Sequence, residues 1–303
     1  MRLMRIGPAG AERPVVRVAQ SGYVDVSDVV GDFDEWFFAA GETDRLRSIV
    51  DERSARGQVD TFGNVRIGAP IARPHQILCV GLNYADHAAE TGAAVPEEPL
   101  VFTKAPNSIT GPNDGIRTPR GATKLDWEVE LGIVIGTRAR YLSDLTEARA
   151  AVAGFVVVND VSERAFQSER GGQWSKGKSA ETFNPVGPWL ATPDEIDDVQ
   201  NLDLWLTVNG VQRQSSTTAQ MIFDPWVIVH YLSQFFVLEP GDLINTGTPP
   251  GVGLGHHPPV WLRSGDVVEL GITGLGVQRQ IVLPPDGPPP TLSLTATTSR
   301  GQQ

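Results

Sequence analysis

The sequence predicts an α+β fold rich in β-strands, in which a small N-terminal region precedes a larger strand-rich core. Two observations predict this fold class. Short runs of β-branched and apolar residues recur from residue 76 to residue 283, and Gly and Pro separate them. Only a few segments have the length and apolar spacing of a helix. A chain of 303 residues suits one large domain, or a large domain with a small one.

The first region, residues 1–70, is predicted to be a small accessory domain. Strand-like pieces occur at residues 15–18 and 23–26, and a helix is predicted over residues 44–56. Few residue types suited to catalysis cluster there. We therefore expect the chemistry to lie in the second region.

The second region, residues 71–283, is the predicted catalytic domain. Strands are expected at residues 77–80, 128–135, 154–159, 203–208, 242–245 and 266–272, and helices at residues 146–153 and 225–236. This many short strands, separated by Gly and Pro turns, favour a sandwich or a barrel. Residues 284–303 are Pro-rich and then Ser/Thr-rich, and we expect them to be a disordered tail.

Composition excludes several classes of function. The net charge is −11 and no block of Lys and Arg occurs, so nucleic acid is not an expected partner. The single cysteine, Cys79, lies in an apolar run and is predicted to be a buried small hydrophobe. It has no partner for an internal disulfide, which fits a reducing compartment. Neither an apolar signal core nor a run of roughly 18 apolar residues occurs, which predicts a cytoplasmic protein with no membrane partner.

The strongest chemical signal is a run of alternating acidic and apolar residues, Asp126-Trp127-Glu128-Val129-Glu130. Alternate side chains of a strand share a face, so both glutamates are expected to point the same way, and the apolar residues the other way. Adjacent buried carboxylates repel one another, and a bound divalent cation removes that cost. Taken alone, the pattern is more often an exposed acidic strand face than a metal site.

A further acid strengthens the metal hypothesis. Asp160 ends the apolar run Phe155-Val156-Val157-Val158-Asn159, which is a rigid way to direct one carboxylate. Three carboxylates without nearby Cys or His favour a hard cation, so we predict Mg²⁺, with Mn²⁺ as the alternative, held by Glu128, Glu130 and Asp160.

Two neighbouring segments carry polar residues at helical spacing. His87 and Glu90 are three positions apart, and a carboxylate beside an imidazole suits a general base. Arg164 and Gln167 follow Asp160 by four and seven positions and would line one side of a helix leaving the strand. On spacing alone, each of these residues is more often a solvated surface residue.

The order of several short motifs resembles the fumarylacetoacetate hydrolase family over residues 76–280. The segments that carry the resemblance are residues 80–87 (VGLNYADH), 99–104 (PLVFTK), 126–136 (DWEVELGIVIG), 159–164 (NDVSER), 176–179 (KGKS), 245–253 (NTGTPPGVG) and 262–266 (LRSGD). The resemblance implies a mixed β-roll in the C-terminal domain, a small N-terminal domain and a homodimer. It also implies that the three acids are metal ligands.

The resemblance assigns roles to other residues as well. It implies that the segment with His87 and Glu90 is a lid whose dyad activates water. Lys178 resembles a family lysine that meets substrate oxygens, and Thr248 resembles a family substrate contact. Arg164 and Gln167 would position the substrate. One departure is Ala180-Glu181-Thr182, where relatives often have Asp before the Thr.

Within the family, the chain is similar to enzymes that hydrolyse 2,4-diketo-3-deoxy-L-rhamnonate or -fuconate. The implied reaction breaks the C3–C4 bond of a 2,4-diketo acid and yields pyruvate and a second acid such as L-lactate. Two alternatives stay open. The same site could serve oxaloacetate decarboxylation or the isomerisation or lysis of a 2-hydroxy-diene-dioate, or the chain could be a catalytically silent metal-binding homologue.

The remaining motifs indicate no further function. The Gly-rich run at residues 251–255 lacks the Lys-Ser/Thr of a phosphate-binding loop, and His256 and His257 beside it are expected to be loop residues. Neither a G-x-S-x-G nor an H-E-x-x-H motif occurs, so serine-hydrolase and zinc-protease functions have no support.

Overall fold

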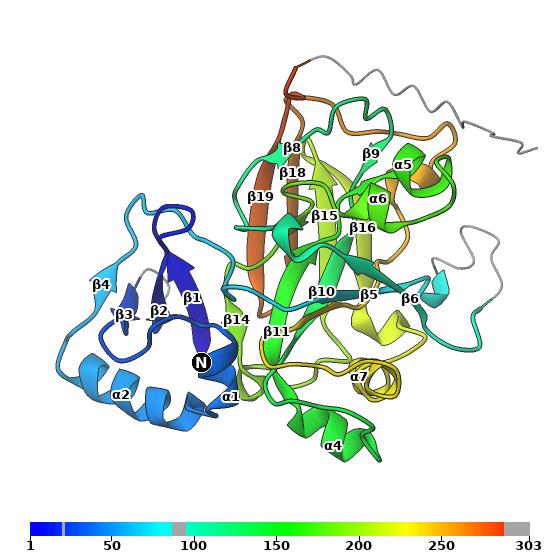
Figure 1. Cartoon of the computed structure of the whole chain (residues 1–303). Coiled ribbons are helices and arrows are strands. Elements are labelled where there is room, and N and C mark those ends of the chain that lie inside the picture. The colour runs from blue at the N-terminus through cyan, green and yellow to red at the C-terminus, as the bar shows by residue number, and fades with distance from the viewer. Residues whose placement is uncertain (20–21, 87–94, 288–303) are drawn as a thin grey trace, which may run out of the picture.

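A ten-stranded mixed sheet runs from the N-terminal region into the strand-rich part of the protein (Figure 1). The computed structural model describes residues 1–19, 22–86 and 95–287. The strands follow one another in the order β4 (Asp60–Thr61), β3 (Gly22–Asp25), β2 (Arg13–Arg17), β1 (Arg2–Ile6), β14 (Leu190–Ala191), β11 (Val152–Asn159), β10 (Val129–Ile135), β17 (Leu243–Asn245), β5 (Ile77–Gly81) and β6 (Leu100–Lys104).

The N-terminal region supplies four strands of this sheet. Helices α1 (Glu35–Ala39) and α2 (Thr43–Ala55) pack beside β1–β4, as Figure 1 shows in blue. The helix predicted over residues 44–56 and both predicted strands are confirmed. Strand β1 pairs with β14 of the second region, so one hydrogen-bonded sheet extends across both regions. The division into domains at residue 70 stays a prediction.

A second sheet faces the first. Its strands are β16 (Val211–Thr217), β15 (Asp203–Val208), β18 (Val267–Ile272), β19 (Gly276–Leu283) and β8 (Ile116–Arg117). Strands β10 and β11 pack against β15, β18 and β19, and apolar side chains from both sheets form one core. Both sheets are open in the described residues, so the strand-rich core is a sandwich rather than a closed barrel.

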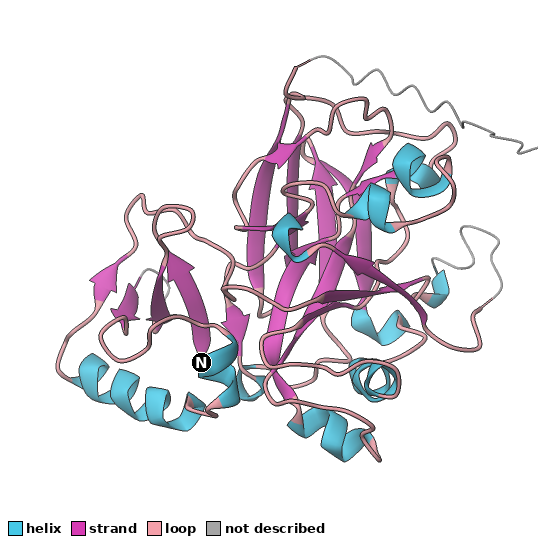
Figure 2. Ribbon diagram, in the orientation of Figure 1, coloured by secondary structure: helices cyan, strands magenta, loops and turns pink. Residues whose placement is uncertain are grey.

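The helices lie at the margins of the strands (Figure 2). They are α4 (Leu145–Ala150), α5 (Arg164–Ser168), α6 (Ser175–Lys178) and α7 (Pro225–Ser233), with short 3₁₀ turns at η1 (Pro106–Ser108), η2 (Pro193–Glu195), η3 (Thr218–Gln220) and η4 (Gly253–Gly255). The remaining short strands pair as β9 (Leu125–Asp126) with β12 (Ser162–Glu163) and as β7 (Ile109–Thr110) with β13 (Asn184–Pro185).

Two predicted helices are confirmed with shorter ends. Helix α7 begins at the predicted residue because the Asp224 side chain accepts hydrogen bonds from the backbone N–H groups of Trp226 and Val227. Helix α4 ends three residues before the predicted end, because the chain enters β11 at Val152. No helix in the described ranges is long and apolar enough to cross a membrane.

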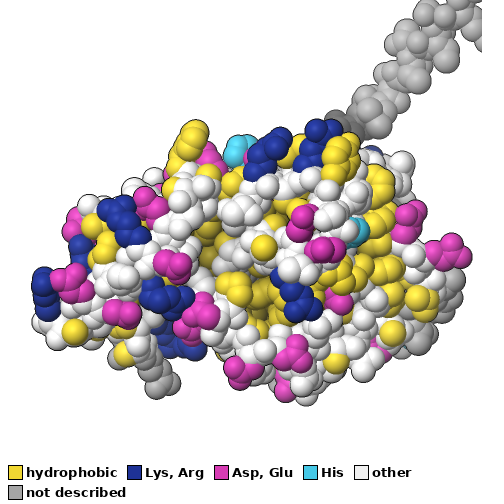
Figure 3. Space-filling model, turned by 90° about the horizontal axis from the view of Figure 1, so that it is seen from below, with side chains coloured by type: hydrophobic (Ala, Val, Ile, Leu, Met, Phe, Trp, Pro, Cys, Tyr) yellow, Lys and Arg dark blue, Asp and Glu magenta, His cyan; other side chains and the backbone are white. Residues whose placement is uncertain are grey.

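The surface seen from below carries Lys and Arg interspersed with Asp and Glu, and apolar side chains between them (Figure 3). That face therefore has mixed electrostatics rather than a basic stripe of the kind that binds nucleic acid. The absence of a nucleic-acid partner stays a prediction.

Candidate metal centre

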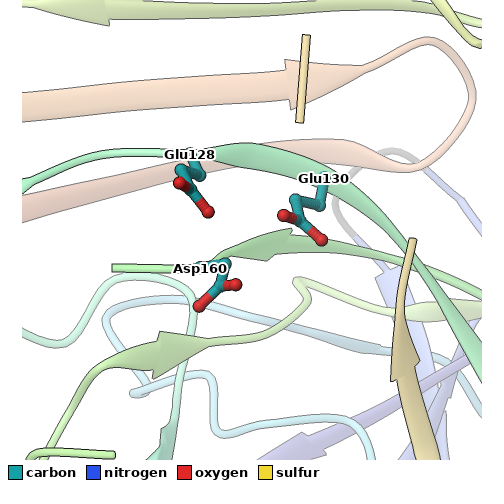
Figure 4. A group of neighbouring side chains, drawn as sticks. All are labelled: Glu128, Glu130 and Asp160. Atoms are coloured by element: carbon teal, nitrogen blue, oxygen red, sulfur yellow. The ribbon is translucent and has the colours of Figure 1, made fainter. Parts of the chain in front are cut away.

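Three carboxylates meet where strands β10 and β11 lie side by side (Figure 4). The two strands are antiparallel, so the start of β10 is next to the end of β11. Glu128 precedes β10, Glu130 is its second residue, and Asp160 follows β11. Ligand oxygens of the three residues lie within 4.8 Å of one another, and all three side chains are buried. The predicted convergence of these three acids is confirmed.

The alternation of the strand explains the orientation of the glutamates. Trp127, Val129 and Leu131 are fully buried in the core shared by the two sheets. Because side chains alternate across a strand, packing these three residues turns Glu128 and Glu130 to the opposite face. The backbone N–H of Asp160 donates to the Glu128 carbonyl at 2.9 Å, which holds the third acid beside them.

Two buried lysines neutralise part of this charge. The Lys178 ammonium donates to Glu128 at 2.6 Å and to Asp160 at 2.9 Å. Lys104 donates to the other Asp160 oxygen and to the Phe183 carbonyl at 2.7 Å. Burial acts to lower the pKa of Lys178, but the charges of Asp160 and Glu128 outweigh it and raise the pKa. Lys178 is therefore a fixed cation at neutral pH.

Arg164 organises the second side of the cluster. It opens α5 and donates to Asp126 at 2.8 Å, to Glu128 at 2.6 Å and to Gln167 at 3.1 Å. The predicted placement of Arg164 and Gln167 on one side of a helix after Asp160 is confirmed. Three of the five guanidinium N–H groups are engaged by described residues, and these contacts leave two for a ligand.

Glu130 differs from Glu128 in having no ion-pair partner within the described residues. Its carboxylate accepts a hydrogen bond from the backbone N–H of Gly247 at 2.8 Å. Burial raises the pKa of Glu130 well above its ordinary value, and the charges of Asp160 and Glu128 raise it further. Burial also acts to raise the pKa of Glu128, but Lys178 and Arg164 outweigh it and lower that pKa.

The charge balance of the cluster favours a bound cation. Four buried carboxylates face three cationic side chains, so one negative charge lacks a counter-ion; the groups are Asp126, Glu128, Glu130 and Asp160 against Lys104, Arg164 and Lys178. The donor set is carboxylate oxygen, which suits a hard divalent ion. Each carboxylate has about four acceptor positions, so the lysine contacts do not exhaust them.

The cluster forms the floor of a pocket of about 530 Å³, which is in the size range of small-molecule sites. The predicted site residues that line it are Glu128, Glu130, Arg164, Gln167, Lys178 and Thr248. Asp160 is fully buried and does not line the pocket. His87 and Glu90 lie outside the described residues.

Thr248 is placed at the pocket with its hydroxyl turned toward the protein. The hydroxyl donates to the Val129 carbonyl at 2.9 Å and accepts from Gln214 at 2.8 Å. Its only proton is therefore engaged, and a substrate could reach only a remaining lone pair. Its role as a substrate contact stays a prediction.

The structure places two further residues in the cluster, Lys104 and Asp126, for which the sequence predicted no role. Asp126 accepts from Arg164 and from the backbone N–H of Gly253 at 2.6 Å, so it ties the glycine-rich loop to the pocket. A charged residue at the end of an apolar strand was the available signal for Lys104. Cys79 is buried, as predicted, and burial raises the pKa of its thiol.

Comparison with known proteins agrees with this geometry. Residues 76–283 match the family model described as the fumarylacetoacetate (FAA) hydrolase C-terminal region. A Burkholderia ambifaria protein is 51% identical over 92% of this chain and 98% of its own length, and it carries the provisional name of a hydrolase with no stated substrate.

Two solved structures are similar over nearly the whole chain. One is named a probable 2-hydroxyhepta-2,4-diene-1,7-dioate isomerase from Mycobacterium abscessus, with 30% identity and a TM-score of 0.79 over 95% of this chain and 100% of that one. The other is maleylpyruvate hydrolase from Sphingobium, solved with manganese(II) and pyruvate, with 26% identity and a TM-score of 0.77 over 94% of this chain and 100% of that one.

Proposed function

The chain belongs to the fumarylacetoacetate hydrolase family, and on that premise we propose that it is a divalent-metal-dependent hydrolase that breaks the C3–C4 bond of a 2,4-diketo acid and releases pyruvate. The observation that carries the proposal is the trio of buried carboxylates at the floor of a ligand-sized pocket. The manganese and pyruvate in the maleylpyruvate hydrolase structure support the same chemistry.

The metal would be held by Glu128, Glu130 and Asp160, and we propose Mg²⁺ or Mn²⁺. When bound, the ion supplies positive charge against the negative charge that develops as the bond breaks. Glu130, a buried carboxylate without a cationic partner among the described residues, is the feature of this chain that fits such an ion.

The side chains of the pocket orient the diketo acid. Arg164 has two N–H groups left for the substrate carboxylate, and Gln167 beside it offers an amide. Lys178 lies at the same floor and places a fixed positive charge near the forming enolate oxygen. Because these groups are held by ion pairs before substrate binds, little reorganisation is needed in the reaction.

Water activation is assigned to His87 and Glu90 on the family resemblance. The imidazole takes a proton from water, the water oxygen bonds to C4, and the C3–C4 bond breaks. The electron pair passes to the pyruvate fragment as its enolate, which takes a proton at C3. The products are pyruvate and the acid derived from C4 onward, which is L-lactate for the deoxysugar acids that the resemblance suggests.

An isomerase is the second candidate, because a similar structure carries that name. Isomerisation or decarboxylation also develops enolate charge, so it needs nearly the same cluster. It requires no water attack, and this difference separates the candidates. A catalytically silent homologue would bind the metal and turn over no substrate.

The test measures pyruvate release from 2,4-dioxopentanoate by the dialysed enzyme, with Mg²⁺, with Mn²⁺ and with excess chelator. We expect turnover only with metal. The variant His87→Ala should lose about 100-fold or more in kcat while keeping metal affinity. The exposed His75 provides the matched control His75→Ala, which should keep the wild-type rate. Full activity in chelator contradicts the metal role, and isomerised product without pyruvate favours the second candidate.

A further inference from the structure

The pocket has a polar floor and an apolar wall. All four of its Asp, Glu, Lys and Arg side chains belong to the carboxylate cluster already described. The apolar side chains among the other described lining residues are Val80, Leu82, Phe102, Trp174, Val252 and Leu254, and the polar ones are Gln167, Ser168, Thr248 and His257. A substrate whose diketo acid end lies on the floor therefore directs its other end toward this wall.

An aromatic pair forms one side of the wall. The rings of Phe102 on β6 and Trp174 just before α6 are 5.2 Å apart with a 62° angle between their planes. The Lys178 ammonium lies 5.2 Å from the centre of the Phe102 ring, so the aromatic surface begins directly beside the charged floor. Gly81 makes room for the indole, because a Cβ there would lie 3.1 Å from Trp174 and 2.9 Å from Leu100.

The other side of the wall comes from the loop after β17. Leu254 is 49% exposed although it is a large apolar residue, and it lines the pocket. Its backbone N–H donates to Asp126 at 3.1 Å, so the loop that carries it is fixed to the cluster. Leu82 also faces the pocket and has a φ of +52°, a backbone conformation uncommon for leucine. An apolar residue exposed on a fixed loop beside a pocket favours an apolar ligand.

The polar groups of the pocket are poorly suited to a second charge or to several hydroxyls. Lys178 is engaged with the cluster, and the two remaining N–H groups of Arg164 are assigned to the carboxylate of the diketo acid end. The hydroxyls of Ser168 and Thr248 both donate to backbone carbonyls. His257 is the other titratable residue among the described lining residues. A distal carboxylate would lose water there without gaining a Lys or Arg partner among the described lining residues.

We propose that the acyl end of the substrate, beyond the bond that breaks, is an uncharged apolar group the size of a phenyl or branched alkyl group. This inference rests on the proposed function, and it narrows the substrate class. Among 2,4-diketo acids, it predicts a higher kcat/KM for apolar acylpyruvates than for carboxylate-terminated ones. It also predicts a higher kcat/KM for them than for the deoxysugar acids, whose acyl group is small and hydroxylated.

The test compares matched diketo acids by pyruvate release under saturating metal. In one pair, 7-methyl-2,4-dioxooctanoate and 2,4-dioxoheptanedioate differ only in an isopropyl group or a carboxylate at the distal end. We expect kcat/KM to favour the apolar acid by about 10-fold or more. The compound 2,4-dioxo-4-phenylbutanoate should likewise exceed 2,4-dioxopentanoate, since the aromatic wall contacts its ring.

A variant tests the wall directly. Leu254→Arg places a cation at the rim, and we expect it to lower the apolar-to-carboxylate ratio at least about 10-fold. The matched control is Leu145→Arg, a 39% exposed leucine on α4 that does not line the pocket, which should keep the wild-type ratio. Equal or faster cleavage of the carboxylate acid by the wild-type enzyme overturns this inference alone. Absence of pyruvate from every diketo acid overturns the proposed function, and this inference with it.

Discussion

Removing the charge of Glu130 is the cleanest test of the metal centre, because this carboxylate alone of the three lacks an ion pair in the described chain. Glu130→Gln keeps the size of the side chain and an oxygen that can accept from the Gly247 N–H. Replacing Glu128 would instead remove one ion-pair partner from Arg164 and Lys178, and replacing Asp160 would remove one from Lys104 and Lys178. A change at Glu130 therefore reports on the missing counter-ion with little other disturbance.

The magnitude follows from binding linkage. A metal present at about 100 times its Kd adds about 2.7 kcal/mol to the free energy of unfolding. For a chain of 303 residues, an unfolding entropy of roughly 2.1 cal/mol/K per residue converts this into a rise of about 4 °C in Tm. We expect that rise in the wild type, and less than about 1 °C in Glu130→Gln. Without metal, the variant should be at least as stable as the wild type, because it no longer buries an unpaired carboxylate.

The assay is thermal unfolding, followed by circular dichroism, with Mg²⁺ or Mn²⁺ and after dialysis against chelator. Glu269→Gln is the control, since Glu269 is a half-exposed carboxylate on β18 outside the pocket, and it should keep the wild-type metal response. An undiminished metal-induced rise in the Glu130→Gln variant would refute the assignment of Glu130 as a ligand. Marked destabilisation of the metal-free variant would refute the reasoning on charge.

Two further predictions concern stability. Lys104→Met removes one of the two ammonium partners of the buried Asp160 carboxylate and leaves Lys178 as the other, so it should cost about 1–3 kcal/mol in urea unfolding at neutral pH, and an unchanged midpoint would contradict the ion pair. Burial acts to raise the pKa of Asp114, but hydrogen bonds, foremost those from Arg66, lower it below its ordinary value. The ionised Asp114 carboxylate therefore stabilises the folded state above the unfolded pKa of about 3.9, and this stabilisation is lost as pH falls through the folded pKa. Asp114→Asn should therefore cost about 1–2 kcal/mol at pH 7, and urea titrations below pH 4 should show the difference shrinking; a difference that grew on acidification would contradict the sign.

The local patterns were predictable from the sequence. Strand alternation placed Glu128 and Glu130 on one face, and helical spacing placed Arg164 beside Gln167, because both periodicities are properties of a few consecutive residues. Helix α2 was found for the same reason. The helix ends were predicted less accurately from the sequence. Helix α4, for example, ends because the chain enters β11, and local propensity does not encode that.

The contacts between distant segments depended on tertiary structure. Lys104 and Asp160 are 56 positions apart, and they meet only because the fold brings the ends of β6 and β11 together beside the carboxylate cluster. The apolar wall likewise joins Phe102, Trp174 and Leu254 from three separate segments. The sequence by itself determined which residues share a face and which acids can gather around an ion. Only the folded chain decided which cations compensate those acids and what surface faces the substrate, because these depend on strand order and loop placement, which local periodicity does not encode.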